Sequence, residues 1–138
     1  MVDAVSDRDG PPASTMSVLV ADDTPELRLV VRMLLERAGG FDVVAEASDG
    51  QEAIELAERH RPDVVLLDLT MPRLSGADAL PRIREVSPRS VVIVLTGYQR
   101  DERTEELLKG GAHAALEKVD LPRRLAQEIN RIMQDVRG

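Results

Sequence analysis

The chain lacks several residue types, and each absence removes a class of function. There is no cysteine among its 138 residues, which excludes a disulfide framework and thiolate zinc sites. With no tryptophan, one tyrosine and one phenylalanine, it has no aromatic platform on which nucleic-acid bases could stack. Its two histidines, His60 and His113, offer little to a transition metal. The core must therefore be aliphatic, built from valine, leucine, isoleucine and alanine.

Charge and hydropathy narrow the function further. The net charge is −7, from 25 acidic and 18 basic residues, which argues against direct nucleic-acid binding by this domain. No apolar run approaches the roughly 20 residues of a membrane span, so we expect no membrane association. Residues 1–16 lack the cationic start and apolar stretch of a signal peptide. We therefore expect a cytoplasmic protein with a disordered extension at 1–16 and one domain at 17–137.

Strand and helix patterns alternate after residue 16. Short apolar runs predict five strands, at about 17–21, 42–47, 63–67, 91–95 and 113–117. Helical spacing of apolar residues predicts a helix after each strand, and the last two helices span about 101–109 and 121–136. Thr24 and Ser75 are the expected N-caps of the first and third helices. Pro81 predicts a kink or a late start in the third helix.

This alternation predicts an α/β fold: a five-stranded, doubly wound parallel sheet of the flavodoxin-like (βα)5 type. A strand order of 2-1-3-4-5 would place strands one, three, four and five next to one another. Open α/β sheets bind ligands at the carboxyl ends of their strands. The residues at those four ends are Asp22 and Asp23, Asp68, Thr96 and Lys118.

The three aspartates are the most informative group in the chain. Asp22-Asp23 and Asp68 each follow a run that is typical of a buried strand. Crowded carboxylates repel one another and raise each other's pKa unless a cation joins them. A hard divalent cation with oxygen ligands, Mg²⁺, fits such a site best. Either motif alone could be an ordinary turn or helix cap, whereas together they predict phosphate chemistry.

The ordered set of motifs resembles the receiver domain of two-component response regulators over about residues 16–137. The matching segments are Ala21-Asp22-Asp23, Leu67-Asp68-Leu69-Thr70-Met71-Pro72, Ser75-Gly76, Leu95-Thr96-Gly97, and Gly110-Gly111-Ala112 leading to Lys118. Each segment alone is a weak signal, but the full set in this order is a specific one. The local sequence is similar to receivers that are attached to helix-turn-helix DNA-binding domains.

The resemblance implies a role for each residue of the cluster. Asp68 would accept the phosphoryl group. Mg²⁺ would be held by oxygen atoms of Asp22, Asp23, Asp68 and the backbone carbonyl of Thr70. The Thr96 hydroxyl and the Lys118 ammonium would contact the phosphoryl oxygens. These roles agree with the chemistry, because a carboxylate that attacks phosphorus needs the charge on both groups neutralised.

The chain departs from the family pattern at two positions. Val119 follows Lys118 where most members have a proline in a cis peptide, so we expect a trans bond here. Ala115 stands where many members carry an aromatic switch residue, so that kind of signal readout cannot operate. Tyr98, two residues after Thr96, is a candidate gate to the site, and with Thr70 it occupies a position that tunes dephosphorylation in the family.

The resulting prediction is a phosphoacceptor switch that catalyses only its own phosphorylation and dephosphorylation. A stand-alone receiver is the first interpretation, and a receiver fragment of a DNA-binding transcription regulator is the second. A Mg²⁺ phosphatase with an aspartyl nucleophile is disfavoured, because such enzymes place a second aspartate where this chain has Thr24 or Thr70. A receiver that has lost its chemistry and serves only as a binding module is disfavoured, because no site residue is missing.

The resemblance also implies partners. The phosphoryl donor would be the phosphohistidine of a sensor histidine kinase or of a histidine phosphotransfer protein. A downstream protein, or an output domain outside this sequence, would read the signal. The helix at 101–109, weakly anchored by Leu107 and Leu108, is the element expected to move. The face formed by strand five and the last helix would carry the signal, in a monomer or a weak homodimer through that face.

Overall fold

In the computed structural model, residues 15–97 and 102–138 are described. Five parallel strands form one sheet in this part of the chain: β2 (Met16–Ala21), β3 (Phe41–Ala47), β4 (Val64–Asp68), β5 (Val91–Thr96) and β6 (Ala114–Glu117). They pair in the order β3-β2-β4-β5-β6, which confirms the predicted order 2-1-3-4-5. Of the predicted extension at 1–16, Met16 belongs to β2 and Thr15 precedes it. Residues 1–14 lie outside the described residues.

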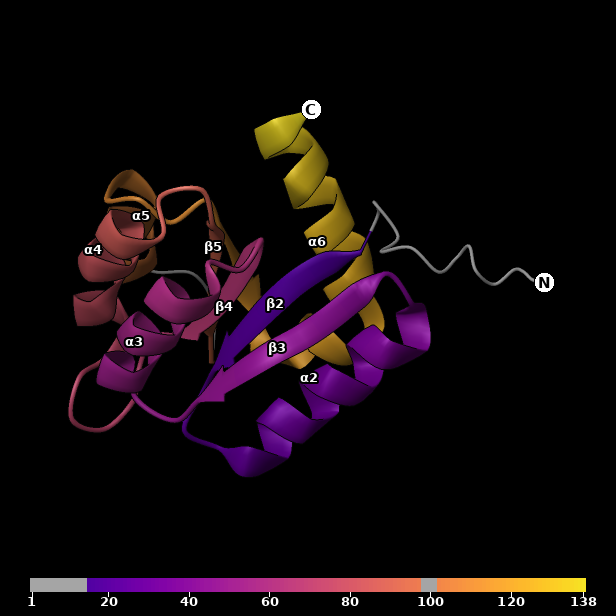
Figure 1. Cartoon of the computed structure of the whole chain (residues 1–138), viewed down its shortest axis with the longest axis horizontal. Coiled ribbons are helices and arrows are strands. Elements are labelled where there is room, and N and C mark those ends of the chain that lie inside the picture. Colours follow the sequence, from indigo (N-terminus) through magenta and orange to yellow (C-terminus); the bar gives the residue numbers. More distant parts are fainter. Residues whose placement is uncertain (1–14, 98–101) are drawn as a thin grey trace.

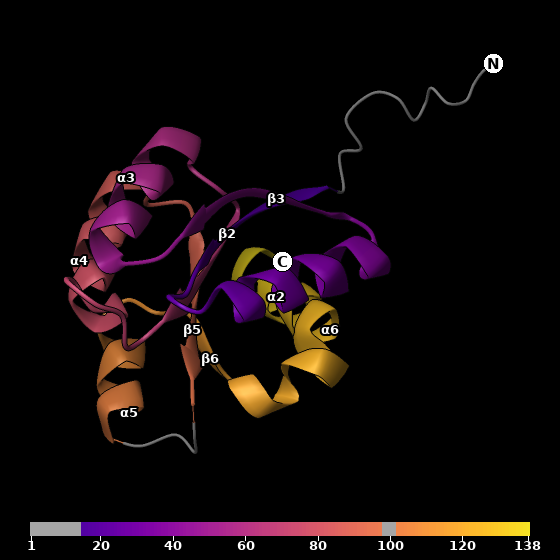
Figure 2. The same cartoon turned by 90° about the horizontal axis from the view of Figure 1, so that it is seen from below.

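Helices cover both faces of the sheet (Figures 1 and 2). One face carries α2 (Pro25–Ala38) and α6 (Leu121–Arg137). The other carries α3 (Gly50–His60), α4 (Gly76–Val86) and α5 (Glu102–Lys109). None of the helices in the described ranges combines the length and the apolar character that a membrane span requires.

The core is aliphatic and divided by the sheet, as the composition predicts. Every residue of β4 and β5 is buried, because a parallel strand in the middle of such a sheet faces helices on both sides. Successive side chains point to opposite faces. Leu66 and Ile93 therefore pack with α2 and α6, whereas Leu67 and Val94 pack with α3 and α4.

The helix ends follow the sequence with two differences. Ser75 caps α4 as predicted, because its side chain accepts the Asp78 amide at 3.1 Å. Thr24 occupies the N-cap position of α2 but makes no side-chain cap bond; its own amide donates to Asp22 instead. Of the two effects predicted for Pro81, a kink or a late start, the late start does not occur: the helix begins at Gly76 and includes Pro81. Pro81 removes one backbone donor, but the buried face of α4 holds the helix to the sheet.

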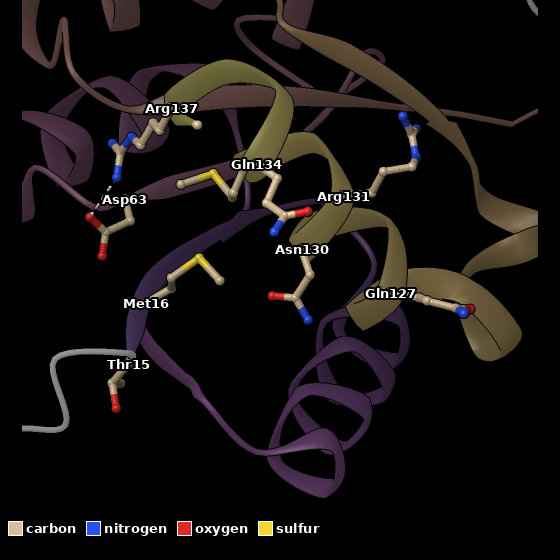
Figure 3. A pocket seen from close by; sticks show the side chains of 10 residues that line it. Thr15, Met16, Asp63, Gln127, Asn130, Arg131, Gln134 and Arg137 are labelled. Carbon is tan, nitrogen blue, oxygen red and sulfur yellow. Dashed lines mark hydrogen bonds and ion pairs between the residues drawn. The ribbon is translucent and has the colours of Figure 1, made fainter.

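Asp63 connects three elements at the end of the sheet opposite the aspartate cluster. Its Oδ2 accepts the amide of Ser17 at 2.9 Å, and its own amide donates to Ser17 Oγ at 2.9 Å. Its Oδ1 forms an ion pair with Arg137 of α6 at 3.3 Å (Figure 3). Asp63 therefore joins the entrance of β4 to β2 and to the last turn of α6.

We expect Asp63→Ala to lower the free energy of unfolding by about 1–3 kcal/mol, because it leaves the Ser17 amide without its acceptor. Asp63→Asn keeps an acceptor oxygen and loses only the partly exposed ion pair with Arg137, so its loss should be below about 1 kcal/mol. Urea unfolding followed by circular dichroism measures both values. Equal losses for the two variants would show that the charge, and not the hydrogen bond, provides the connection.

Candidate functional site

The residues at the carboxyl ends of four strands meet at one edge of the sheet. Asp22 directly follows β2, Asp68 ends β4, Thr96 ends β5, and Lys118 directly follows β6. These strands are neighbours in the sheet and run parallel, so their ends must lie together. The sequence predicted this grouping, and the sheet order produces it.

The three aspartates lie close enough to share one cation. Each of Asp22, Asp23 and Asp68 offers one carboxylate oxygen, and these oxygens lie within 4.8 Å of one another. Asp22 and Asp68 are buried, whereas Asp23 is exposed. Lys118 bridges the two buried carboxylates, with its Nζ 3.0 Å from Asp22 Oδ2 and 3.2 Å from Asp68 Oδ1. The cluster thus has two buried anions, one exposed anion and one cation.

Backbone contacts fix the orientation of Asp22. Its amide donates to the carbonyl of Ala47 in β3 at 3.0 Å. Its Oδ1 accepts the Thr24 amide at 2.8 Å, a local turn that aspartate favours. The other oxygen, Oδ2, is buried and accepts no hydrogen bond of normal geometry from the described residues, although the Lys118 ammonium lies 3.0 Å away. The Lys118 ion pair is therefore the contact that balances the charge on this oxygen.

Arg28 and Glu46 form a hydrogen-bonded network that holds the backbone of the turn at Asp22. Arg28 donates from Nη1 to the carbonyl oxygen of Asp22 at 2.6 Å and from Nε to Glu46 at 3.0 Å. Arg32 also pairs with Glu46. These hydrogen bonds, that of Arg32 foremost, lower the pKa of Glu46. No local sequence pattern indicates this network, because it joins residues of α2 to a residue of β3 that lies next to them only in the folded chain.

The electrostatic state of Asp68 reflects its crowded surroundings. Burial, and next the charge of Asp22, raise the pKa of Asp68 to about 6 despite the opposing attraction of Lys118. Burial alone would lower the pKa of Lys118, but its contacts with Asp22 and Asp68 together outweigh burial and raise that pKa. Lys118 is therefore charged at neutral pH, and it does not fully offset the repulsion between the buried carboxylates.

A hard divalent cation fits this donor set. The candidate ligand atoms are carboxylate oxygens, which Mg²⁺ prefers over nitrogen and sulfur ligands. Lys118 is shared between Asp22 and Asp68, and the raised pKa of Asp68 shows that one ammonium does not offset the repulsion between the two buried carboxylates. A cation shared by the cluster would lower that pKa.

Thr70 lies in the loop after β4, and Thr96 ends the neighbouring strand β5. Thr70 is exposed, and its amide donates to Asp68 Oδ1 at 3.4 Å. Thr96 is buried at the end of β5, where it pairs in register with Glu117 of β6. Strand β5 also pairs directly with β4, with Leu95 opposite Asp68. Thr96 therefore directly follows Leu95, the residue of β5 that pairs with Asp68.

Gly76 has a role at the site that the sequence analysis did not assign. A Cβ added to Gly76 would lie 1.9 Å from the carbonyl oxygen of Asp68, so no other residue fits without moving the backbone. The amide of Gly76 donates to the carbonyl of Leu69 at 3.1 Å. The close approach of α4 to the end of β4 thus requires glycine. The sequence motif Ser75-Gly76 contained this signal, but only its cap was interpreted.

Two of the residues that depart from the family pattern, Val119 and Ala115, lie among the described residues. The described part of the chain contains no cis peptide bond, so the Lys118–Val119 bond is trans, as predicted. Lys118 begins a short 3-10 helix, η1 (Lys118–Asp120), and the Val119 side chain is exposed. Ala115 pairs with Val94 and packs against the core. Tyr98, the predicted gate, lies outside the described residues.

Cavity size does not locate the site. A pocket of about 770 Å³ lies between α6 and the start of β2, beside the Asp63–Arg137 ion pair (Figure 3). Its wall on α6 carries exposed amide side chains, among them Gln127, Asn130 and Gln134. This pocket lies at the end of the sheet opposite Asp68. The converging charges, and not the pocket volume, identify the candidate site.

Comparison with known proteins gives the same assignment. Residues 18–130 match the family described as the response regulator receiver domain. The chemotaxis protein CheY of Thermotoga maritima is 31% identical over 115 residues, which cover 83% of this chain and 95% of CheY. The nitrate/nitrite response regulator protein NarP of Escherichia coli is 40% identical over 119 residues, which cover 86% of this chain and 55% of NarP.

A solved structure supports the assignment at the level of the fold. The two-component response regulator of the LuxR family from an Aurantimonas species superposes with a TM-score of 0.82 at 34% identity, over 88% of this chain and 87% of that one. The chain thus spans nearly all of CheY but about half of NarP. The family match includes the whole acidic cluster, four complete strands and β2 from Val18 onward. The chain belongs to the family of response regulator receiver domains.

Proposed function

We propose that this receiver domain is a Mg²⁺-dependent phosphoacceptor switch in which Asp68 takes the phosphoryl group. The observation that carries the proposal is the pairing of two buried carboxylates, Asp22 and Asp68, across one lysine that does not fully offset their repulsion. Asp22, Asp23, Asp68 and the Thr70 carbonyl would hold the metal. Such a group of charges costs stability, and phosphoryl transfer gives that arrangement a purpose.

The proposed chemistry is a transfer between two nucleophiles. An oxygen of the Asp68 carboxylate attacks phosphorus, an O–P bond forms, and the N–P bond of a donor phosphohistidine breaks. The electron pair stays on the imidazole nitrogen, and the ring leaves neutral because its other nitrogen carries a proton. Lys118 balances charge on the phosphoryl oxygens, and Thr96 donates its hydroxyl to one of them. Bound Mg²⁺ would neutralise the remaining charge of the phosphoryl group and the carboxylates.

The signal would leave the site through α5. This helix is short and has a single buried residue, Thr104, among those described, so few contacts oppose its movement. An inward shift of Thr96 on phosphorylation would change the path of the chain into α5. The face formed by α5, β6 and α6 would then bind partners differently in the two states. Because Ala115 takes the place of an aromatic switch residue, the backbone and not a ring would transmit the change.

The phosphoryl donor would dock beside the site on α2. The outer face of this helix exposes Leu29, Val30 and Met33, with Leu29 56% and Met33 54% accessible. Exposed apolar side chains that cluster on one helix face mark a protein contact. The donor would be a sensor histidine kinase or a histidine phosphotransfer protein, as the family implies.

The output beyond the receiver is a separate proposal. The match to CheY covers 95% of CheY, which favours a stand-alone receiver that signals by binding other proteins. NarP, matched along about half its length, favours the second candidate, a receiver joined to an output domain. In both cases this domain would contact no nucleic acid and would catalyse only its own phosphorylation and dephosphorylation. A cytoplasmic location and a monomer or weak homodimer stay predictions.

The test uses beryllofluoride, a phosphoryl mimic, with and without Mg²⁺, followed by amide NMR of the wild type and Asp68→Asn. We expect Mg²⁺-dependent shifts at Asp68, Thr96 and residues 102–118 in the wild type and none in the variant. Incubation with acetyl phosphate and Mg²⁺ should add one acid-stable, base-labile phosphate to the wild type only. A wild type that neither shifts nor gains phosphate would leave a binding module with a receiver fold. Turnover of a generic phosphate ester would favour the phosphatase alternative.

A further inference from the structure

The loop between β4 and α4 is fastened to the N-terminus of α3 by two neighbouring contacts. The guanidinium of Arg73, in this loop of residues 69–75, donates to Oδ2 of Asp49 from Nε at 3.0 Å and from Nη2 at 2.5 Å. One residue further along both segments, the Gly50 amide donates to the carbonyl oxygen of Leu74 at 2.7 Å. We call these two contacts the loop clamp.

Asp49 is a fixed partner for the arginine. It is buried at the N-cap of α3, and its Oδ1 accepts the Glu52 amide at 2.8 Å. This cap bond, and next the hydrogen bond from Arg73, lower the pKa of Asp49. The carboxylate is therefore charged at neutral pH and held by its own helix, so Arg73 is attached to a rigid point.

The backbone of Arg73 shows that the loop is held under constraint. Its φ angle is 64°, in the left-handed region that a side chain with a Cβ disfavours. Arg61, the other non-glycine residue with positive φ in the described chain, is the C-cap of α3, where this conformation ends a helix. Arg73 ends no helix. Such a conformation persists where surrounding contacts impose it, and the bond to Asp49 is such a contact.

The second contact leaves no room for the two segments to adjust. A Cβ on Gly50 would lie 2.3 Å from the carbonyl oxygen of Leu74. The backbone of α3 and the loop therefore lie too close together for a side chain at position 50. On the other side of the loop, the contact to the acidic cluster is long: the Thr70 amide lies 3.4 Å from Asp68 Oδ1. The contacts of the loop clamp are therefore shorter than the contact of the loop with Asp68.

We propose that Arg73 is a positioning residue, which acts through Asp49 to set the place of the Thr70 carbonyl in the metal site. The inference rests on the proposed function, because the Thr70 carbonyl is a metal ligand only if the acidic cluster binds a cation. Thr70 lies three residues before Arg73 in the same loop. Contacts that orient metal ligands without touching the metal commonly change metal affinity by about 10–100-fold. Loss of the loop clamp should therefore weaken Mg²⁺ binding and leave the fold intact.

The test compares Mg²⁺ affinity, measured by amide NMR titration of the full chain, in the wild type, Arg73→Gln and Asp49→Asn. Asparagine still caps a helix well, so Asp49→Asn removes the ion pair and keeps the α3 cap. Arg131→Gln is the matched control, because Arg131 pairs with Glu128 on the far side of α6. We expect each of the two clamp variants to lose about tenfold in affinity, the double variant to lose no more, and the control to match the wild type.

The direction of the two effects separates the clamp from a general field effect. Removing the positive charge of Arg73 would strengthen cation binding through the field, and removing the negative charge of Asp49 would weaken it. The clamp predicts that both variants bind Mg²⁺ more weakly. Opposite changes, or equal affinity in all variants, would overturn the proposal.

Two further measurements keep the outcomes distinct. Metal-free melting temperatures of the clamp variants should lie within about 3 °C of the wild type, because the Arg73 side chain is exposed and Asp49→Asn keeps the cap of α3. Lower melting temperatures with unchanged Mg²⁺ affinity would assign the contacts to stability alone and overturn the inference. A wild type that binds no Mg²⁺ would overturn the proposed function together with this inference. A wild type that binds Mg²⁺ and variants that bind it equally would overturn only the role of Arg73.

Discussion

Replacing Asp68 with asparagine should make the metal-free protein more stable at pH 7.5, although it removes the proposed phosphoacceptor. In the folded protein the pKa of Asp68 is about 6, against an ordinary value of 3.8. A difference of this size corresponds to about 3 kcal/mol of unfavourable environment for the carboxylate. Because the variant also deprives Lys118 of one partner, we expect a net gain of about 1–3 kcal/mol. Thermal unfolding in the presence of a chelator measures this gain.

The pH dependence of the gain has a defined sign. Between pH 3.8 and about 6 the folded wild type binds a proton at Asp68 more tightly than the unfolded chain does. The wild type therefore loses stability as the pH rises through this window. Asp68→Asn has no such dependence. The two proteins should differ little below about pH 4, and the difference should be complete above about pH 7.

Metal and a surface substitution provide the controls. Saturating Mg²⁺ should raise the melting temperature of the wild type and leave that of Asp68→Asn nearly unchanged, because a ligand stabilises only the state that binds it. Asp42→Asn, at an exposed position on β3, should shift the stability by less than about 0.5 kcal/mol. A destabilised Asp68→Asn would mean that Lys118 compensates the buried carboxylate fully.

Gly76→Ala should destabilise the protein by at least about 3 kcal/mol, in the range of severe single substitutions. The added Cβ would lie 1.9 Å from the carbonyl oxygen of Asp68, with the carbonyl carbon at 2.8 Å. Both obstacles are backbone atoms, so no side-chain rotation relieves the clash. Either α4 moves away from β4 or the end of β4 is displaced. Urea unfolding measures the loss of stability, and Mg²⁺ titration should show weaker binding in any protein that still folds.

Gly97→Ala is the matched control for this prediction. Gly97 follows Thr96 at the same edge of the sheet, and a Cβ there meets no atom within 4 Å. The variant should change the free energy of unfolding by less than about 1 kcal/mol. If Gly76→Ala were as stable as Gly97→Ala, the backbone at the start of α4 would be free to shift, and its close approach to Asp68 would not be required.

The sequence was sufficient to predict the five strands and the cluster residue at each strand end, because both follow from patterns local to the chain; the strand order 2-1-3-4-5 was the order expected for a flavodoxin-like sheet. The run of apolar residues before Asp68 predicts a buried strand, and a parallel strand places its last residue at the ligand edge. The contacts that hold the cluster depend on pairs that are distant in sequence. Arg28 reaches Glu46, and Arg73 reaches Asp49, and no local pattern indicates either pair.

The ends of the helices show the same difference between local patterns, which the sequence reveals, and packing between distant residues, which it does not. Ser75 was predicted as a cap from its residue type and position, which are local. Pro81 was predicted to kink α4 or to delay its start, whereas the helix begins directly after its Ser75 cap. Ala79, Leu80 and Ile83 are buried against the sheet and maintain the helix. Tertiary packing here outweighs a local propensity.

The bridging ammonium of Lys118 supplies part of the positive charge that the acidic cluster needs. It lies about as close to Asp22 as to Asp68, so a cation bound at the proposed metal site would compete with a charge that the protein carries itself. The free energy of metal binding would then be the difference between two attractions and not the whole of one. Carboxylates without this lysine would retain the ion more tightly and exchange it more slowly. A built-in counterion would therefore keep occupancy of the proposed site responsive to the concentration of free metal.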